Sequence, residues 1–148
     1  RDWSSDVCSS DLARYGQFTN SLTFTLRPRI EARFSVSSQR RGANVCQVLD
    51  GPSIDCRLDA SASIGTIRSY VWTFETSNTT WGQSSRDPQI GIEEFGCDLI
   101  ANERAITDNN GEKYVRLTIH LTLLDPNRDV GDETEKTIRL YVGSTCGF

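Results

Sequence analysis

The run from Cys56 to Phe74, CRLDASASIGTIRSYVWTF, carries the clearest structural pattern in the chain. Apolar residues occupy alternate positions in two segments, 56–60 and 70–74, and a Gly-containing stretch connects them. Period-2 alternation is typical of half-buried strands, and we expect these two segments to pair antiparallel. Trp72 falls on the apolar side of the second segment. The pattern therefore predicts a tryptophan at the centre of a core between two sheets.

The same alternation recurs along the chain and predicts an all-β fold. Its strongest instance runs from Val115 to Leu123, and a further one runs from Ile138 to Val142. We interpret the polar or turn-rich stretches 37–44, 75–87 and 130–135 as loops. No amphipathic helical period is present, and about seven short strands separated by turns indicate an antiparallel β-sandwich. Other expected inward positions are Ala32, Phe34 and Val36. Residues 89–95 are expected to form a weak strand, in which Gly91 suggests either a sheet edge or a bulge.

Residues 1–12, RDWSSDVCSSDL, stand apart from the rest of the chain. They resemble the in-frame translation of a common short-read sequencing adapter, and they lack strand or helix periodicity and the apolar run of a signal peptide. We therefore expect this segment to be non-native and the native sequence to begin near Ala13. Residues 13–29 contain one alternating run, Leu22 to Leu26, followed by Pro28. We expect them to be the end of a preceding domain or a linker; an extra edge strand of the main domain is the alternative.

Length, charge and hydropathy narrow the classes of partner. Without Arg1, Asp2, Asp6 and Asp11 the chain has 15 basic and 17 acidic side chains, a net charge of −2. A nearly neutral chain without a basic cluster argues against nucleic-acid binding. No apolar run approaches the roughly 18 residues of a membrane-spanning helix. The remaining residues are enough for one domain with a full core.

Four cysteines remain when Cys8 is set aside: Cys46, Cys56, Cys97 and Cys146. Their spacing matches no zinc-site pattern. An even number in a β-rich chain without methionine favours disulfides and an oxidising compartment, with four buried free thiols as the alternative. Of the three connectivities, we favour Cys46–Cys56, which are near in sequence. The second pair, Cys97–Cys146, would then tie the long connection over 96–111 to the C-terminal tail.

Three motifs in this order resemble the PKD (polycystic-kidney-disease-type) domain: LDASAS from Leu58, IRSYVWTF from Ile67 and VRLTIHLTLLD from Val115. The resemblance covers roughly Ile30 to Val142, and the Cys-Gly-Phe end is similar to that of bacterial members with paired cysteines. It implies an immunoglobulin-like β-sandwich domain over residues 30–148, C-terminal tail included. It further implies a secreted or cell-surface protein in which the domain is a spacer or binding accessory.

One departure from the PKD pattern concerns the turn after the Trp-containing strand. The family has a tight Gly-Asp-Gly turn there, whereas this chain continues Thr73-Phe74-Glu75-Thr76. We therefore expect a longer loop, and Trp81 lies within it. In such a loop an indole ring could stack on a sugar or on a partner's aromatic ring, so Trp81 is the candidate ligand contact. Folding back onto the core is the alternative.

Few other residues have side chains that suggest catalysis or metal binding, and we predict no catalytic residue, no metal site and no cofactor. His120 is the only histidine and falls on the outward side of its strand, so no catalytic triad or multi-histidine metal site can be assembled. Four aspartates could supply oxygen ligands to calcium. Aspartates that hydrogen-bond the backbone of their own turn are the preferred interpretation. These aspartates are Asp50, Asp55, Asp59 and Asp125.

These observations predict a non-catalytic accessory, spacer or binding module of a larger secreted or cell-surface bacterial protein. The expected partners are a glycan or protein ligand and the adjacent domains of the same chain, with no nucleic acid and no membrane span. An adhesion or carbohydrate-binding domain is the first alternative. A fragment of a catalytic domain is the second, and it would need converging titratable groups in a pocket.

Overall fold

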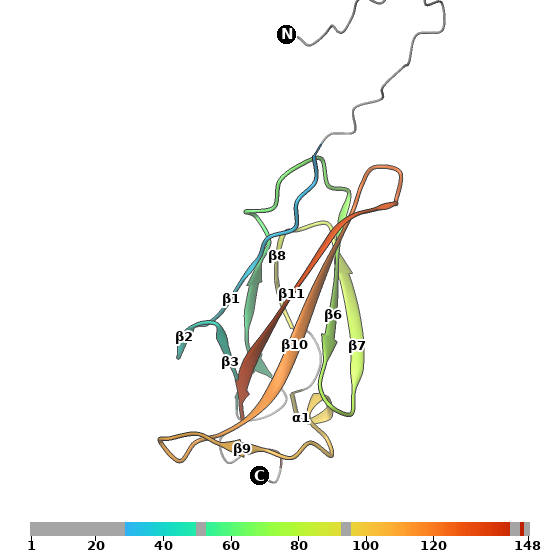
Figure 1. Cartoon of the computed structure of the whole chain (residues 1–148). Helices are drawn as coiled ribbons and strands as arrows, with labels where there is room; N and C mark the ends of the chain where they lie inside the picture. The colour runs from blue at the N-terminus through green and yellow to red at the C-terminus, as the bar shows by residue number, and fades with distance from the viewer. Residues whose placement is uncertain (1–28, 50–52, 93–95, 143–145, 147–148) are drawn as a thin grey trace, which may run out of the picture.

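The computed structural model describes residues 29–49, 53–92, 96–142 and 146. Eleven strands and one short helix, α1 (Gly96–Leu99), make up the regular structure of this part of the chain (Figure 1). The all-β fold expected from the sequence is thereby confirmed. No helix among the described residues is long and apolar enough to cross a membrane.

The strands form two sheets. The smaller sheet has the strand order β2-β1-β5-β8, and the larger has the order β4-β3-β11-β10-β6-β7, with β9 added against β10. The smaller sheet consists of β1 (Ser35–Ser38), β2 (Gly42–Ala43), β5 (Arg57–Asp59) and β8 (Gln89–Gly91). The larger consists of β3 (Val45–Val48), β4 (Ile54–Asp55), β6 (Ser69–Glu75), β7 (Thr80–Ser85), β9 (Ile106–Thr107), β10 (Lys113–Leu124) and β11 (Val130–Tyr141).

One apolar core draws side chains from both sheets, and Trp72 is at its centre as predicted. Trp72 is 0% exposed, and the ring of Phe34 meets it edge-on with centroids 5.3 Å apart. Strand β10 supplies every second residue from Val115 to Leu123, all of them buried. Each fully buried leucine or isoleucine contributes about 1.5–3 kcal/mol through removal of apolar surface from water. The inward positions predicted near the N-terminus, Ala32, Phe34 and Val36, are also buried.

The two alternating segments between Cys56 and Phe74 do not pair with each other, so the expected hairpin is wrong. Strand β5 pairs with β1 and β8 in the smaller sheet, whereas β6 pairs with β10 and β7 in the larger. The connection between them is too long for a tight turn and crosses from one sheet to the other. Gly65 makes this crossing feasible: its φ is +116°, and a Cβ there would come within 2.5 Å of the Arg29 carbonyl oxygen.

Three stretches interpreted as loops contain strands, so the count of about seven is wrong. Residues 37–44 include the end of β1 and all of β2, residues 75–87 include β7, and residues 130–135 begin β11. These pieces lie at sheet edges or project beyond the core. Strands in such places need little apolar alternation, because backbone hydrogen bonds to a neighbouring strand hold them and much of their side-chain surface is exposed. The weak strand expected at 89–95 is present only over Gln89–Gly91, as the edge strand β8; residues 93–95 lie outside the described residues.

One strand pair departs from the predicted antiparallel pattern. Strand β3 runs parallel to β11, with Val45 opposite Arg139 and Cys46 opposite Leu140. The other strand pairs among the described residues are antiparallel. The expectations for residues 1–12, for the strand at 22–26 and for the turn at 50–52 concern positions outside the described residues.

The chain enters and leaves the two-sheet body at opposite ends (Figure 1). At the entry, the Ala32 backbone N–H donates to Asp132 Oδ2 over 2.7 Å, so this segment lies beside the start of β11. Strand β11 then runs the length of the body and ends at Tyr141, opposite Tyr114 at the start of β10. A strand of 12 residues is about 40 Å long. The entry and exit points are therefore separated by about the length of β11.

Candidate functional site

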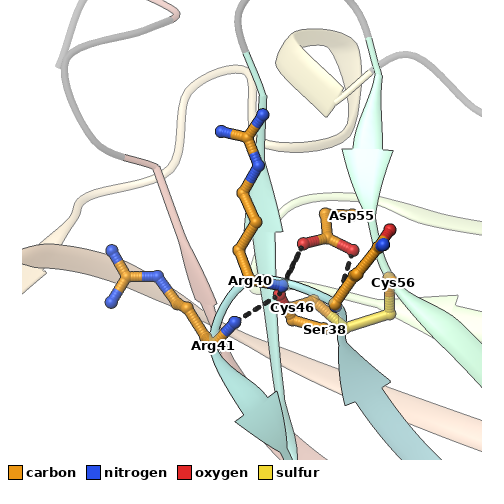
Figure 2. Close-up of a disulfide and its surroundings, with 7 residues drawn as sticks. Ser38, Arg40, Arg41, Cys46, Asp55 and Cys56 are labelled. Atoms are coloured by element: carbon orange, nitrogen blue, oxygen red, sulfur yellow. Dashed lines mark hydrogen bonds between the residues drawn. A yellow bond between two sulfur atoms is a disulfide. The ribbon is translucent and has the colours of Figure 1, made fainter.

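Two cysteine pairs lie at disulfide-bonding distance, with the pairing favoured from the sequence. The Cα atoms are 4.8 Å apart in Cys46–Cys56 and 5.2 Å apart in Cys97–Cys146. Cys56 lies where the chain passes from β4 in the larger sheet to β5 in the smaller, and Cys46 lies on β3 (Figure 2). The first disulfide is buried and fixes this crossing. Two disulfides are typical of proteins that fold in an oxidising environment.

Asp55 organises the turn between β1 and β2 beside this disulfide (Figure 2). Its Oδ2 accepts hydrogen bonds from Ser38 Oγ at 2.6 Å and from the Arg40 backbone N–H at 3.0 Å, and its Oδ1 accepts from the Gln39 N–H at 2.9 Å. Burial alone would raise the pKa of Asp55, but these hydrogen bonds to the ionised form outweigh it and lower the pKa. Both carboxylate oxygens are thus committed to the turn.

A hollow of about 810 Å³ lies between the smaller sheet and the β3–β4 hairpin. Its charged lining consists of two arginines, Arg40 and Arg57, and two aspartates, Asp55 and Asp87. The charges of these described residues balance, and Asp55 is already engaged by the turn. The described lining therefore favours no charged ligand, and none of the described lining residues is an aromatic residue that could stack on a sugar.

Trp81 lies in strand β7 and not in a loop, which corrects the sequence interpretation. Its ring stacks on Phe74 of β6, with centroids 4.9 Å apart and planes inclined by 26°, and it packs against the core. Its Nε1 is buried without a hydrogen-bond acceptor among the described residues. The side chain is partly exposed at the edge of the larger sheet. A role in ligand contact stays a prediction, and only the exposed part of the ring is available for it.

The aspartates considered as calcium ligands are dispersed. Asp59 accepts hydrogen bonds from Ser61, and Asp125 accepts from the backbone N–H groups of Asn127 and Asp129, as expected for aspartates that close their own turns. Across the described residues, no three His, Cys, Asp or Glu side chains gather in a way that could hold a metal ion. Asp50 lies outside the described residues.

His120 lies on the outward face of β10, as predicted. Its two ring nitrogens lie near carboxylates of both neighbouring strands: Nε2 is 3.1 Å from Glu75 Oε1 and Nδ1 is 3.2 Å from Glu135 Oε1. The three side chains come from β6, β10 and β11. On this half of the outward side of the larger sheet, an imidazole ring therefore lies between two carboxylates.

The opposite half of the same surface carries a symmetric set of tyrosines and arginines. Strand β10 contains Tyr114-Val115-Arg116 directly after its first residue, Lys113, and β11 ends with Arg139-Leu140-Tyr141. The antiparallel register places Tyr114 opposite Tyr141 and Arg116 opposite Arg139. The middle residues, Val115 and Leu140, are buried in the core, so the four others share the outer side. We call these four residues, Tyr114, Arg116, Arg139 and Tyr141, the Tyr–Arg face.

Aromatic contacts hold the guanidinium groups of this region in place. The Arg139 guanidinium lies 4.4 Å from the ring centre of Tyr114, and its Nη1 donates to Tyr141 Oη over 3.4 Å. Arg41 lies 4.0 Å over the Tyr141 ring. The Tyr141 hydroxyl donates to Asp108 Oδ2 over 3.0 Å. The hydrogen bond with Tyr141 is the largest of the interactions that raise the pKa of Arg139.

The charges of the region are unequally compensated. Arg41 makes a two-point ion pair with Glu112, at 2.9 and 3.0 Å. Arg116 makes no ion pair with any described residue. It stands directly opposite Arg139, and like charges in that relation are destabilising. A shallow hollow of about 490 Å³ lies along this face, lined also by the exposed polar side chains of Asn44 and Thr137.

The linear pattern of residues did not reveal the Tyr–Arg face. Net charge concealed it, because a nearly neutral chain can still place two arginines opposite each other. The available signal was symmetry: Tyr-x-Arg in one strand and Arg-x-Tyr in its hairpin partner bring like residues face to face. Arg41, from the distant β1–β2 turn, had no such signal.

Comparison with known proteins adds no relative to this picture. The chain matches no protein-family model, no curated protein and no solved structure.

Proposed function

We propose that this chain is a non-catalytic, in-line module of a larger secreted or cell-surface protein, an immunoglobulin-like β-sandwich of the PKD type. The observation that carries the proposal is the position of the two ends: the chain enters one end of a two-sheet body and leaves at the other (Figure 1). A module of this shape holds its neighbours about 40 Å apart.

The disulfides support both the role as a spacer and the location outside the cytoplasm. Cys46–Cys56 fastens the crossing between the sheets, and Cys97–Cys146 fastens the segment after β11 to the connection before β9. A spacer must keep its length under load, and both bonds restrain segments that join strands. Disulfides also favour an extracytoplasmic location, where thiols stay oxidised. The three PKD-like sequence motifs agree with this proposal: one includes Trp72 on β6, and another lies on β10, which pairs with β6.

Energy transfer tests the in-line role in the full chain. One dye is attached at Arg29 and a second after Phe148, both through click-reactive residues so that the cysteines are untouched. Time-resolved measurement is expected to give one narrow distance distribution near the length of β11, and denaturant should broaden it. Ends that lie close together would overturn the in-line role. Turnover of polysaccharide or peptide substrates by the isolated chain would overturn its non-catalytic character.

A carbohydrate-binding or adhesive role is the second candidate, and the exposed arginines of the Tyr–Arg face together with the partly exposed Trp81 favour it. Trp81 is tested by titrating polysaccharides and surface proteins against the wild type and Trp81→Ala. Weakened binding in Trp81→Ala would support a ligand contact at the edge of β7. Unchanged binding would remove Trp81 from consideration and leave the Tyr–Arg face as the candidate.

A further inference from the structure

The Tyr–Arg face keeps two positive charges opposite each other on an exposed sheet surface. Arg116 and Arg139 are cross-strand partners, both are exposed, and neither makes an ion pair with a described residue. A few residues farther along the same hairpin, the ring nitrogens of His120 lie 3.1 and 3.2 Å from the carboxylates of Glu75 and Glu135, so acidic side chains of neighbouring strands do reach this surface. The two arginines lack such a partner within the described protein.

Arg139 is oriented before any ligand arrives. A guanidinium has five N–H donors in a planar fork that matches the two oxygens of a carboxylate. The Tyr114 ring supports the Arg139 plane at 4.4 Å, and the hydrogen bond to Tyr141 uses one donor. Most of the fork therefore remains available, and little side-chain freedom is lost when it engages an anion. Arg116 stands beside it with its donors unengaged by described residues.

The local charge favours one anionic group and not an indiscriminate polyanion contact. The region holds three arginines, Arg41, Arg116 and Arg139, against two acids, Asp108 and Glu112. The chain as a whole has a net charge of −4, which repels a dense polyanion such as a nucleic acid. A uronic acid polymer carries one carboxylate per sugar, whereas duplex nucleic acid carries one charge per about 1.7 Å of helix axis, so the polymer meets less of this repulsion.

We propose that the Tyr–Arg face binds carboxylates of an acidic polysaccharide, a polymer of uronic acid. The hollow along the face is shallow and its two arginines are exposed, so a polymer chain can lie across it. Exposed Asn44 and Thr137 beside the arginines can hydrogen-bond sugar hydroxyl groups. One uronate carboxylate would take the two guanidinium groups as a charge-assisted, two-point partner. The inference rests on the proposed extracytoplasmic role, since such polymers occur outside the cell.

Calorimetric titration of the full chain with polygalacturonate tests this site. The matched ligand control is the same polymer fully methyl-esterified, which keeps the sugar backbone and removes the charge. The wild type is expected to bind the free acid at least tenfold more tightly than the ester. Arg116→Gln and Arg139→Gln should each weaken binding about tenfold, and Arg116→Lys should recover part of the affinity. Arg86→Gln, which removes the same charge from the exposed β7–β8 connection, should bind as the wild type does.

Several outcomes would overturn the proposal. Equal binding of the acid and its ester would show that the carboxylate is not recognised, and wild-type affinity in both Gln variants would place the ligand elsewhere. Tighter binding of dextran sulfate would replace the carboxylate by a sulfate ester. Tighter binding of polyglutamate would replace the glycan by an acidic polypeptide. Absence of binding to all probes would remove the site, while the in-line role, measured by end-to-end distance, would stand on its own test.

Discussion

The two faces of the β10–β11 hairpin follow different rules. On the inner face, alternate residues from Val115 to Leu123 are apolar and buried, and a slip of one residue would turn all of them to water. On the outer face the side chains are polar, and at its middle Thr118 and Thr137 hydrogen-bond across the strands at 2.9 Å. The inner face determines the register. That register sets which side chains of the outer face lie opposite each other, but burial does not restrict which residue types stand there.

The outer face itself has two unlike ends. At one end, His120 lies between Glu75 and Glu135. At the other end, Arg116 and Arg139 stand opposite each other with the same charge. Only the second end places like charges in register, so it is the end at which fold stability and ligand binding are expected to conflict. The predictions below test this contrast, from the core outward.

The largest expected effect is on the inner side. Trp72→Ala should lower the free energy of unfolding by about 3–5 kcal/mol, because it leaves a large cavity between the sheets. Trp81→Ala is the matched control, since it removes the same side chain from a partly exposed strand edge, with an expected loss of about 1–2 kcal/mol. Denaturant titration of both variants measures the difference. Equal losses would mean that the core is not centred on Trp72.

Removing a disulfide should have the next largest effect on the free energy of unfolding. Replacing Cys97 and Cys146 together by alanine should cost about 4 kcal/mol, and replacing Cys46 and Cys56 should cost about 3 kcal/mol, because the closed loops differ in length. The sequence separations are 49 and 10 residues. Thermal unfolding of the two double variants gives the order. A larger loss for the shorter loop would show that the buried Cys46–Cys56 contact matters more than chain entropy.

The sequence predicted the parts of the fold that bury apolar groups. The alternation in β10, the burial of Trp72 and the pairing of the cysteines follow from residues whose environment is set by removal from water. The strands β7 and β2 were missed because edge strands are held by backbone hydrogen bonds that leave little trace in side-chain pattern. The Tyr–Arg face was missed because it depends on register and on a distant turn, neither of which a linear pattern fixes.

A moderate effect is expected at the β1–β2 turn. Asp55→Ala should cost about 1–2 kcal/mol, because it leaves the backbone N–H groups of Gln39 and Arg40 without their acceptor. The pKa of Asp55 is lowered in the folded protein, so its contribution is present above its ordinary value of 3.8 and is lost as the pH falls through the folded pKa. Stability measured from pH 6 to pH 2 should therefore fall less steeply in Asp55→Ala than in the wild type. Parallel stability curves for the wild type and Asp55→Ala would show that the turn contacts do not lower the pKa of this carboxylate.

The smallest effect has the opposite sign and bears most directly on the outer face. Removing one of two like charges that face each other across a ladder relieves repulsion, so Arg116→Gln should raise the Tm by about 1–3 °C in low salt. The gain should shrink in 0.5 M salt, because exposed charges are screened. Arg86→Gln should leave the Tm unchanged. A drop in Tm for Arg116→Gln would mean that Arg116 stabilises the fold, and the argument that its charge serves a ligand would lose its basis. A rise, together with weaker binding of polygalacturonate, would show that the hairpin gives up stability at this position for recognition.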